Sequence, residues 1–506
     1  MSGIQDSLSK LFRSAGIVFL STISTQILAL SAEIFIVRSL SPEEYGTIAV
    51  AYTTALIAGR LSLFGIPEGI TRFISDTSAY REKTSITKQG FVMITPIAII
   101  TSSLFLIFPS QIGNLLNNNE VNDYLVFFSV YAFLFPISRI IISVLRARGE
   151  TFHAVLSKDL FPRVGGLIFF FTILFLGVAE IGAVAYWVSL PLISFVIGLY
   201  FLSAALNLGE VAKASVEWST IRSIWSFSWP LALSSSLIVV FSNIDVMMIE
   251  YFLTSESTGH YRSVQPLRQV TEFVLSSFIF LYLPLATEYF SQGENEKLIQ
   301  LYKSTTKWAT ELTLPLILVF SVFSADLVRI FFGPEYLPAS DALSVLVAGL
   351  FFNVLVGPNG ATAKAINRPR VDMVSAAVGF VVNILLNLLL IPRSGILGAA
   401  IATVIGYVTY NMMEVFLIYV QIGKLPFSIN QIKPIPLTVG CAVLVERSVG
   451  EIGIISIFLI GVLISAIHVV SIILTKSVDK NDTIVINSVE ERIGRELPIV
   501  HDLIND

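Results

Sequence analysis

The chain has 506 residues, of which 54% are hydrophobic and 13% are charged, and its mean hydropathy is +0.79. Soluble domains carry about 25% charged residues, so this composition excludes a soluble protein and predicts an all-α polytopic membrane protein. The net charge of −4 offers no general attraction for nucleic acid, and the single cysteine, Cys441, excludes a disulfide within one chain.

The first half of the chain predicts six membrane-spanning helices. Residues 15–37 form an apolar run that is too long for a removable signal peptide, so we interpret them as the first span. Five further windows are bounded by charge, glycine or proline, at 46–66, 90–109, 124–145, 155–177 and 181–206. The segment Phe64-Gly65-Ile66-Pro67-Glu68-Gly69 is expected to break the second of these six spans, with simple termination of the helix as the alternative. Together they form a predicted N-terminal lobe, residues 1–206.

The second half predicts six more spans, followed by two additional ones. The six spans fall at 228–252, 264–286, 308–331, 340–362, 372–391 and 396–420, and the last two at 434–449 and 452–474. The predicted parts of the chain after the first lobe are a cytoplasmic connection (207–226), a C-terminal six-helix lobe (227–422), transmembrane helices 13 and 14 (423–475) and a cytoplasmic tail (476–506). The expected architecture is therefore about 14 transmembrane helices, as two six-helix lobes plus two C-terminal helices.

The basic residues predict the orientation of these spans. All thirteen lysines fall on the side of the membrane that also holds both termini. Because cytoplasmic loops carry the excess of Lys and Arg, we expect a multi-pass protein of the cell (plasma) membrane with both termini in the cytoplasm.

The two predicted lobes carry a weak internal repeat. Glu33 lies near the end of the first span and Asp245 near the end of the seventh, and each is followed by a glycine, Gly46 or Gly259. Runs of small residues also occur at the start of the sixth and the twelfth predicted spans. Six helices repeated by six helices give two lobes of equal topology, related by an axis along the membrane normal, which suits alternating access.

Charges inside the spans are the candidate site residues, since a charge at the centre of a span costs about 2.5–3.5 kcal/mol and normally faces a cavity or a partner. Arg60 has no acid within one turn of its own helix, and Arg139 and Arg146 lie two turns apart on one face of the fourth span. We interpret Arg60, Arg139 and Arg146 as a substrate-binding path for an anion. The alternatives are a structural ion pair for Arg60 and snorkelling of Arg139 to the headgroups.

Glu33 and Asp245 are the candidate ion-coupling residues. They lie at equal depth in equivalent spans, and acids inside membranes can carry H⁺ or bind Na⁺. Two carboxylates brought close together in a cavity of low dielectric constant cannot easily both ionise, so that a proton can be taken up and released. The alternative is pairing with an arginine such as Arg60.

The sequence contains no catalytic, cofactor-binding or metal-binding pattern. It has no phosphate-binding Gly-x-x-x-x-Gly-Lys-Ser/Thr loop, and its four histidines lack the spacing of metal ligands. The pair Glu43-Glu44 could mimic the acids of a membrane glycosyltransferase. We interpret Ser41-Pro42-Glu43-Glu44 instead as the start of a helix, with an N-cap, a proline and two acids in the first turn.

Several degenerate motifs occur in a specific order along the chain. They are Val37 to Gly46, Ser242-Asn243-Ile244-Asp245, Gly333-Pro334-Glu335-Tyr336, Asn383 with Asn387, and Ile391-Pro392 followed by Gly395 to Ala402. On these residues the chain resembles the polysaccharide-exporter branch of the multidrug/oligosaccharidyl-lipid/polysaccharide flippase superfamily, which includes the Wzx-type O-antigen flippases. It departs from the family pattern at Glu250 and at His260, where the family has Gly and Ile.

The resemblance implies a flippase, not an enzyme, that translocates an isoprenoid-diphosphate-linked oligosaccharide for polysaccharide or glycoconjugate assembly. Its partners would be the lipid-linked glycan and membrane lipid. A coupling ion, H⁺ or Na⁺, and glycan-assembly proteins are further possible partners. Two alternatives are a cation-coupled multidrug exporter of the same fold, which would prefer an acidic cavity, and a membrane glycosyltransferase or glycan polymerase, which needs a metal site or a large external domain.

Overall fold

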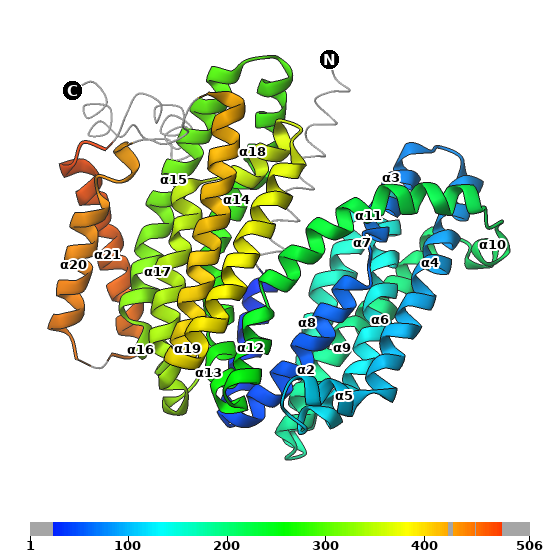
Figure 1. The fold of residues 1–506 in the computed structure, drawn as a ribbon, viewed down its shortest axis with the longest axis horizontal. Coiled ribbons are helices and arrows are strands. Elements are labelled where there is room, and N and C mark those ends of the chain that lie inside the picture. Colours follow the sequence, from blue (N-terminus) through cyan, green and yellow to red (C-terminus); the bar gives the residue numbers. More distant parts are fainter. Residues whose placement is uncertain (1–23, 424–428, 451, 478–506) are drawn as a thin grey trace. The chain divides into compact units, whose positions relative to one another are not determined.

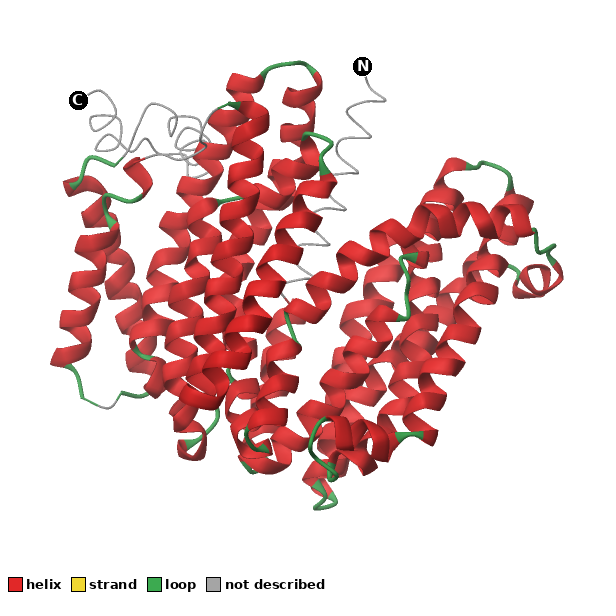
Figure 2. Cartoon of the chain, in the orientation of Figure 1, coloured by secondary structure: helices red, strands yellow, loops and turns green. Residues whose placement is uncertain are grey.

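A computed structural model of the chain describes residues 24–423, 429–450 and 452–477. Every regular element within these ranges is helical (Figure 2), which confirms the all-α membrane class. Eight helices of the described residues are long and apolar enough to cross a membrane, or nine if the bent pair α15–α16 counts as one span. The start of the first predicted span and the tail beyond residue 477 lie outside the described residues.

The difference from the predicted count of about fourteen has local causes. One helix, α19 (Pro369–Ile422), runs through two predicted spans and bends at Gly395, where φ is 57°. Another, α20 (Ile435–Ser448), has 14 residues, fewer than the roughly 20 that a straight crossing needs. The number of membrane crossings, about fourteen, therefore stays a prediction.

Contacts divide the chain into two compact units, Met1–Ser263 and Val264–Asp506. The first unit reaches beyond the predicted lobe boundary at residue 206, because helices α11 to α13 pack against α2 and α3. After helical residues 24–38, its helices (Figure 1) are α2 (Pro42–Leu61), α3 (Ile66–Asp76), α4 (Tyr80–Ile107), α5 (Pro109–Leu115), α6 (Val121–Ala147), α7 (Thr151–Val155), the π-helix η1 (Leu156–Leu160), α8 (Phe161–Phe175), α9 (Ala179–Ala205), α10 (Leu208–Lys213), α11 (Trp218–Phe241), α12 (Ile244–Phe252) and α13 (Ser255–Ser263).

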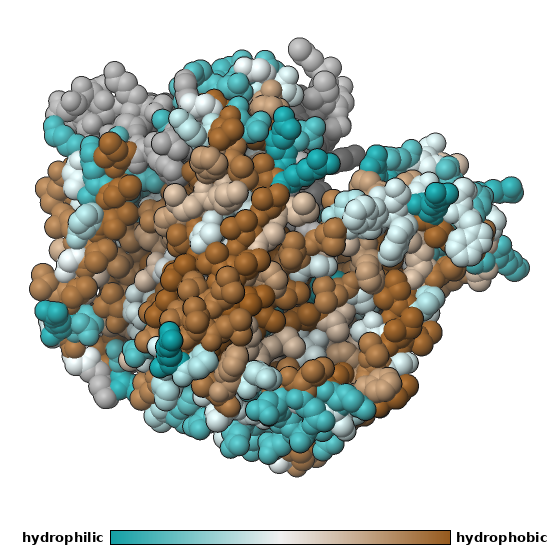
Figure 3. Space-filling view, in the orientation of Figure 1, coloured by the Kyte–Doolittle hydropathy of each residue, from teal (hydrophilic) through white to brown (hydrophobic). Residues whose placement is uncertain are grey.

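The second unit is also helical and carries the long bent helix. It contains α14 (Gln265–Ser291), α15 (Asn295–Val322), α16 (Ser324–Phe331), the 3₁₀ helix η2 (Pro334–Ala339), α17 (Ser340–Val356), α18 (Asn359–Ala365), α19, the 3₁₀ helix η3 (Ile429–Gln431), α20 and α21 (Ile454–Leu474). Exposed Val381, Leu385, Leu388 and Leu389 follow one flank of α19 at helical spacing. The face of the molecule that carries α19 is largely apolar in Figure 3, as expected for a surface against lipid.

Local sequence explains how α2 begins and ends. The Ser41 hydroxyl accepts a hydrogen bond from the Glu44 amide, and the Glu44 carboxylate accepts one from the Ser41 amide at 2.8 Å. This reciprocal capping confirms the interpretation of the acid pair as a helix start. The helix ends at Leu61, and Phe64 and Gly65 both have positive φ, so the predicted break before α3 is also confirmed.

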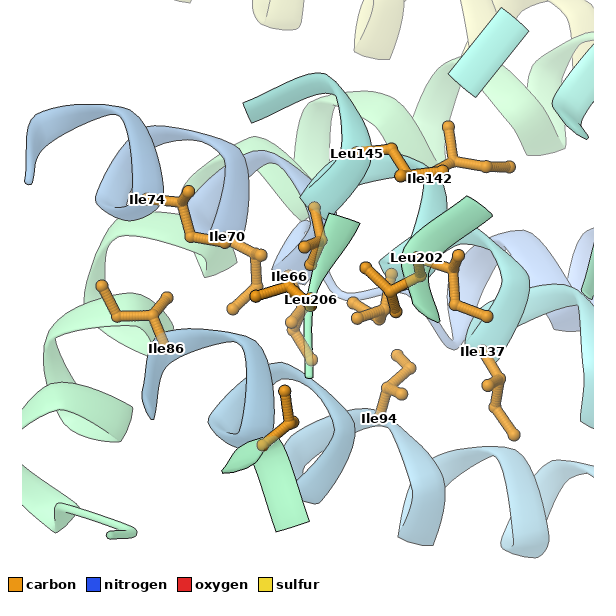
Figure 4. Close-up of a cluster of buried hydrophobic side chains, with 14 of the residues drawn as sticks. Ile66, Ile70, Ile74, Ile86, Ile94, Ile137, Ile142, Leu145, Leu202 and Leu206 are labelled. Atoms are coloured by element: carbon orange, nitrogen blue, oxygen red, sulfur yellow. The ribbon is translucent and has the colours of Figure 1, made fainter. Parts of the chain in front are cut away.

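Apolar side chains hold α3, α4, α6 and α9 together in the first unit. Figure 4 shows isoleucines such as Ile70, Ile94 and Ile137 converging with Leu202 on one cluster, and all four are buried. β-Branched side chains on neighbouring helices interdigitate and restrict rotation, so this cluster supplies a rigid support for the polar residues nearby.

Two glycines let α2 and α13 touch backbone to backbone. A Cβ atom on Gly46 would lie 1.8 Å from the Ser255 carbonyl oxygen, and one on Gly259 would lie 1.8 Å from the Pro42 carbonyl oxygen. Small residues of this kind allow close helix crossings in membranes. The contact is reciprocal, since each glycine lies against the first residue of the other helix. That is the relation expected of the repeated segments in which the sequence places Gly46 and Gly259.

Candidate functional site

A polar pocket lies within the first unit, between α2, α6, η1, α8 and α9. It encloses a cavity of about 120 Å³. Its charged lining consists of Arg60, Arg139, Lys158, Arg163 and Asp159, and its aromatic lining of Tyr52, Tyr131 and Phe135. Four cations and one acid give the lining a net formal charge of +3.

Arg60 and Arg139 meet at one aromatic ring. Their guanidinium carbons lie 5.6 Å and 4.7 Å from the centre of the Phe135 ring. A guanidinium over a ring is attracted by its negative face, which holds both cations beside the cavity, and Asp159 of the same lining also attracts Arg139. The structure thus brings together two of the three predicted anion-binding residues.

Arg146 lies two turns beyond Arg139, in the last turn of α6, and is exposed. It is not part of the pocket lining, although it lies within electrostatic range of Lys158. The predicted path from Arg139 to Arg146 is therefore continued by Lys158 from a different helix.

Lys158 and Arg163 complete the pocket, and the sequence analysis did not single them out. Lys158 belongs to η1, a single π-helical turn that closes with a hydrogen bond from the Phe161 amide to the Leu156 carbonyl. Pro162 follows and has no amide proton to continue a regular helix, and π turns occur frequently at functional sites. The sequence does mark this segment, because three charged residues, Lys158, Asp159 and Arg163, lie within one predicted span.

Short contacts orient this second pair of cations. The Lys158 ammonium lies 3.5 Å from the Asp159 carboxylate, and the Arg163 guanidinium donates a hydrogen bond to the Tyr186 hydroxyl at 3.1 Å. Asp159 is the one acid of the lining, so three positive charges of the pocket remain in excess.

Aromatic rings form one wall of the pocket. Tyr131 and Phe135 stack with ring centres 5.3 Å apart, and Tyr52 stacks on Trp187 at 4.8 Å. Flat apolar faces beside convergent cations are the combination found in pockets that bind a molecule with both polar and apolar parts.

Glu33 and Asp245 are both buried and are not part of the pocket lining, although Glu33 lies within electrostatic range of the pocket residue Arg163. The Glu33 carboxylate accepts a hydrogen bond from the Tyr45 hydroxyl at 2.5 Å and lies 3.3 Å from the Arg262 guanidinium. Asp245 accepts one from the Tyr261 hydroxyl at 2.6 Å and interacts electrostatically with Arg262.

The arginine beside these acids is Arg262 and not Arg60, the alternative partner considered from the sequence. Tyr45 and Arg60 lie fifteen residues apart on α2, so the helix separates their backbones by about 22 Å. Glu33, bonded to Tyr45, therefore lies far from Arg60.

Glu250, where the chain departs from the family pattern, has a local structural role. Its buried carboxylate accepts hydrogen bonds from Asn118 (2.6 Å), Ser255 (2.8 Å) and Thr258 (2.7 Å). It thus connects the turn before α6 to the first turn of α13. Within the described ranges, no group of three or more His, Cys, Asp or Glu side chains is arranged to hold a metal ion.

Comparisons with known proteins agree with this fold. Residues 11–290 match the family described as polysaccharide biosynthesis protein, and residues 230–389 match the MatE family. An uncharacterized membrane protein of Methanocaldococcus jannaschii is 23% identical over 367 residues, which cover 68% of this chain and 71% of that protein. A probable low-salt glycan biosynthesis flippase of Haloferax volcanii is 22% identical over 383 residues, 75% of this chain and 77% of that one.

Among solved structures, the lipid II flippase MurJ in an inward closed conformation has a TM-score of 0.73 at 16% identity, covering 89% of this chain and 97% of the other. The fold is therefore that of a multi-helix membrane flippase or transporter. The chain belongs to the polysaccharide biosynthesis protein family, whose match covers more than half of it, and the resemblance inferred from its motifs is confirmed.

Proposed function

We propose that this protein is a flippase that moves an isoprenoid-diphosphate-linked oligosaccharide across the cell membrane by alternating access, for polysaccharide or glycoconjugate assembly. The observation that carries the proposal is the pocket with a net formal charge of +3 among membrane-spanning helices. Exposing uncompensated charge to lipid is costly, so such a pocket needs an anionic occupant. Relatives named as a glycan biosynthesis flippase and a lipid II flippase support the same substrate class.

Different residues of the pocket would bind different parts of the substrate. Arg60, Arg139 and Arg163 can each present a planar fork of donors to phosphate oxygens, and Lys158 adds a point charge. Arg146, exposed at the end of α6, would attract the headgroup before it reaches the pocket. The aromatic wall offers flat faces to a sugar ring, while the isoprenoid tail can stay in the bilayer.

The charge of the pocket also separates this proposal from its alternatives. A multidrug exporter of cations would need an acidic cavity, and this lining is basic. Three relatives are named as a glycan biosynthesis flippase, a lipid II flippase and an O-antigen transporter, which favours transport over a glycosyltransferase or polymerase role. We place both termini in the cytoplasm, because the lysines gather on that side of the predicted topology.

A strain that lacks the protein provides the direct test. We expect glycan-loaded isoprenoid carrier to accumulate in its lipid extract and to stay in the cytoplasmic leaflet, because assembly continues while transfer stops. Leaflet distribution can be measured with a membrane-impermeant reagent that modifies the glycan. A leaflet distribution equal to that of the parent strain would refute the proposed activity.

We further propose that Glu33 and Asp245 couple flipping to an H⁺ or Na⁺ gradient through Arg262. Arg262 is attracted by both acids. A cation that neutralises one of them weakens the attraction on Arg262 and loosens the contact of α13 with the segment around Glu33. This gives an ion a way to change the packing of two helices.

Glu33→Gln and Asp245→Asn test this coupling in reconstituted vesicles. We expect each variant to lose most of the response of flipping to an imposed H⁺ or Na⁺ gradient, since the amide cannot bind the ion. Glu43→Gln is the matched control, because Glu43 is an exposed acid in the first turn of α2. Variants that respond to a gradient as the parent does would show that the two acids are structural.

A further inference from the structure

A second pair of buried carboxylates lies in the second unit, where α17, α18 and α19 meet. Glu414 on α19 is 0% exposed and Asp372, also on α19, is 8% exposed. Asp372 accepts a hydrogen bond from the Tyr410 hydroxyl at 2.9 Å and lies 3.9 Å from the Lys364 ammonium. Both carboxylate oxygens of Glu414, in contrast, lack a well-formed hydrogen bond among the described residues, although Tyr410 and Asp372 lie close enough to interact with them.

The charges around the pair do not balance. Among the described residues, Lys364 is the cation that interacts with the pair, and its side chain is 58% exposed. The other titratable groups that interact with Glu414 are the tyrosines Tyr410, on α19, and Tyr302, on α15. One positive charge thus faces two carboxylates. Burying a carboxylate that no full positive charge balances costs several kcal/mol, so among the described residues the pair lacks one positive charge.

The surrounding structure holds Glu414 in place instead of allowing it to reach water. Asn411, one turn before it, accepts a hydrogen bond from the Asn359 amide at 2.8 Å and donates one to Asn353. These bonds join α17, α18 and α19 around the carboxylate. Gly360 lies against Glu414, because a Cβ atom there would be 3.4 Å from its Oε1.

The helix beside Glu414 is broken. Between α17 and α18 the chain passes through Gly357, at φ +75°, and Pro358. A side chain at Gly357 would clash with Thr306, whose Oγ1 would be 1.9 Å from the added Cβ. Broken helices inside membrane proteins are tolerated where they are buried or line a cavity, and in transporters they accompany ion sites.

We infer that Asp372 and Glu414 form a binding site for one small monovalent cation, a proton or Na⁺. Either ion supplies the missing positive charge. Two carboxylates with amide groups nearby provide the hard oxygen ligands that Na⁺ accepts, and two carboxylates can also share a proton. The site belongs to the second unit alone and does not depend on the proposed flipping, since binding can be measured without transport.

Binding by the purified full-length protein tests the inference. If the ion is Na⁺, radioactive sodium binds saturably, and the affinity falls at least tenfold in Glu414→Gln and in Asp372→Asn. If it is a proton, the infrared band of a protonated carboxylic acid is present near neutral pH and is lost in Glu414→Gln. Asp341→Asn is the control, because Asp341 is an exposed acid at the start of α17 of the same unit.

Two results would overturn the inference. One is a parent protein that neither binds Na⁺ nor shows the protonated-carboxyl band. The other is a signal that persists in both variants, since it would then arise from another group. Elution volume and thermal unfolding show whether each variant is folded. Asp372→Asn can still accept the Tyr410 hydrogen bond, so it provides the decisive comparison if Glu414→Gln does not fold.

Discussion

Replacing Arg60 by glutamate is expected to abolish flipping of the lipid-linked glycan while leaving a folded protein. The substitution lowers the net formal charge of the pocket from +3 to +1 and places a carboxylate where a phosphate would bind. One hydrogen bond to a charged group contributes about 1.5–3 kcal/mol, and 1.4 kcal/mol corresponds to a factor of ten. Loss of the contact and the added repulsion together predict a decrease of more than a hundredfold.

Arg139→Gln should weaken flipping less, by about tenfold, because it removes one charge without reversing it. Both variants are measured in vesicles that contain the purified protein and a lipid-linked glycan. Arg81→Glu provides the matched charge reversal, since Arg81 is exposed at the start of α4 and outside the pocket. If a well-folded Arg60→Ala protein flips the lipid-linked glycan at the rate of the parent, Arg60 does not bind the substrate.

Gly46→Leu and Gly259→Leu are expected to destabilise the first unit strongly. The first atom added at either position would lie 1.8 Å from a backbone carbonyl oxygen of the facing helix. Rotation of a side chain cannot relieve a clash with backbone, so α2 and α13 must separate. Overpacking of a well-packed site costs about 1–3 kcal/mol, and separation also strains the network of Glu250 and the contact of Glu33 with Arg262.

Thermal unfolding of the purified protein measures this effect. Gly440→Leu is the control, because Gly440 lies inside helix α20 with no atom within 4 Å of an added Cβ. Leucine is also a better helix former than glycine, so this variant should be at least as stable as the parent. An unchanged unfolding temperature in Gly46→Leu would show that the close crossing of α2 and α13 does not contribute to stability.

The candidate sites differ in how their residues could be recognised. Arg60 and Arg139 stand out in the sequence because each interrupts a long apolar window, and the cost of a charge in lipid makes any such interruption informative. Lys158 and Arg163 lie near the end of a predicted span, where a basic residue can reach the headgroups. Only the π turn η1 and the position of α8 place them beside the cavity.

The sequence by itself determined the membrane class, the helical architecture and the local helix signals. Apolar content and the spacing of charges are properties of the linear sequence, and the capping of α2 by Ser41 and Glu44 is a contact between residues three positions apart. Such properties are local, so they can be derived before the chain is folded.

Tertiary structure decided the partners of the buried charges. Glu33 pairs with Arg262, and Glu414 lies beside Asp372, across distances in sequence that no periodicity specifies. Which helices adjoin depends on the packing of whole faces, such as the crossing at Gly46 and Gly259. Because a buried charge is stabilised only by the groups that this packing brings to it, its partner cannot be derived from its own helix.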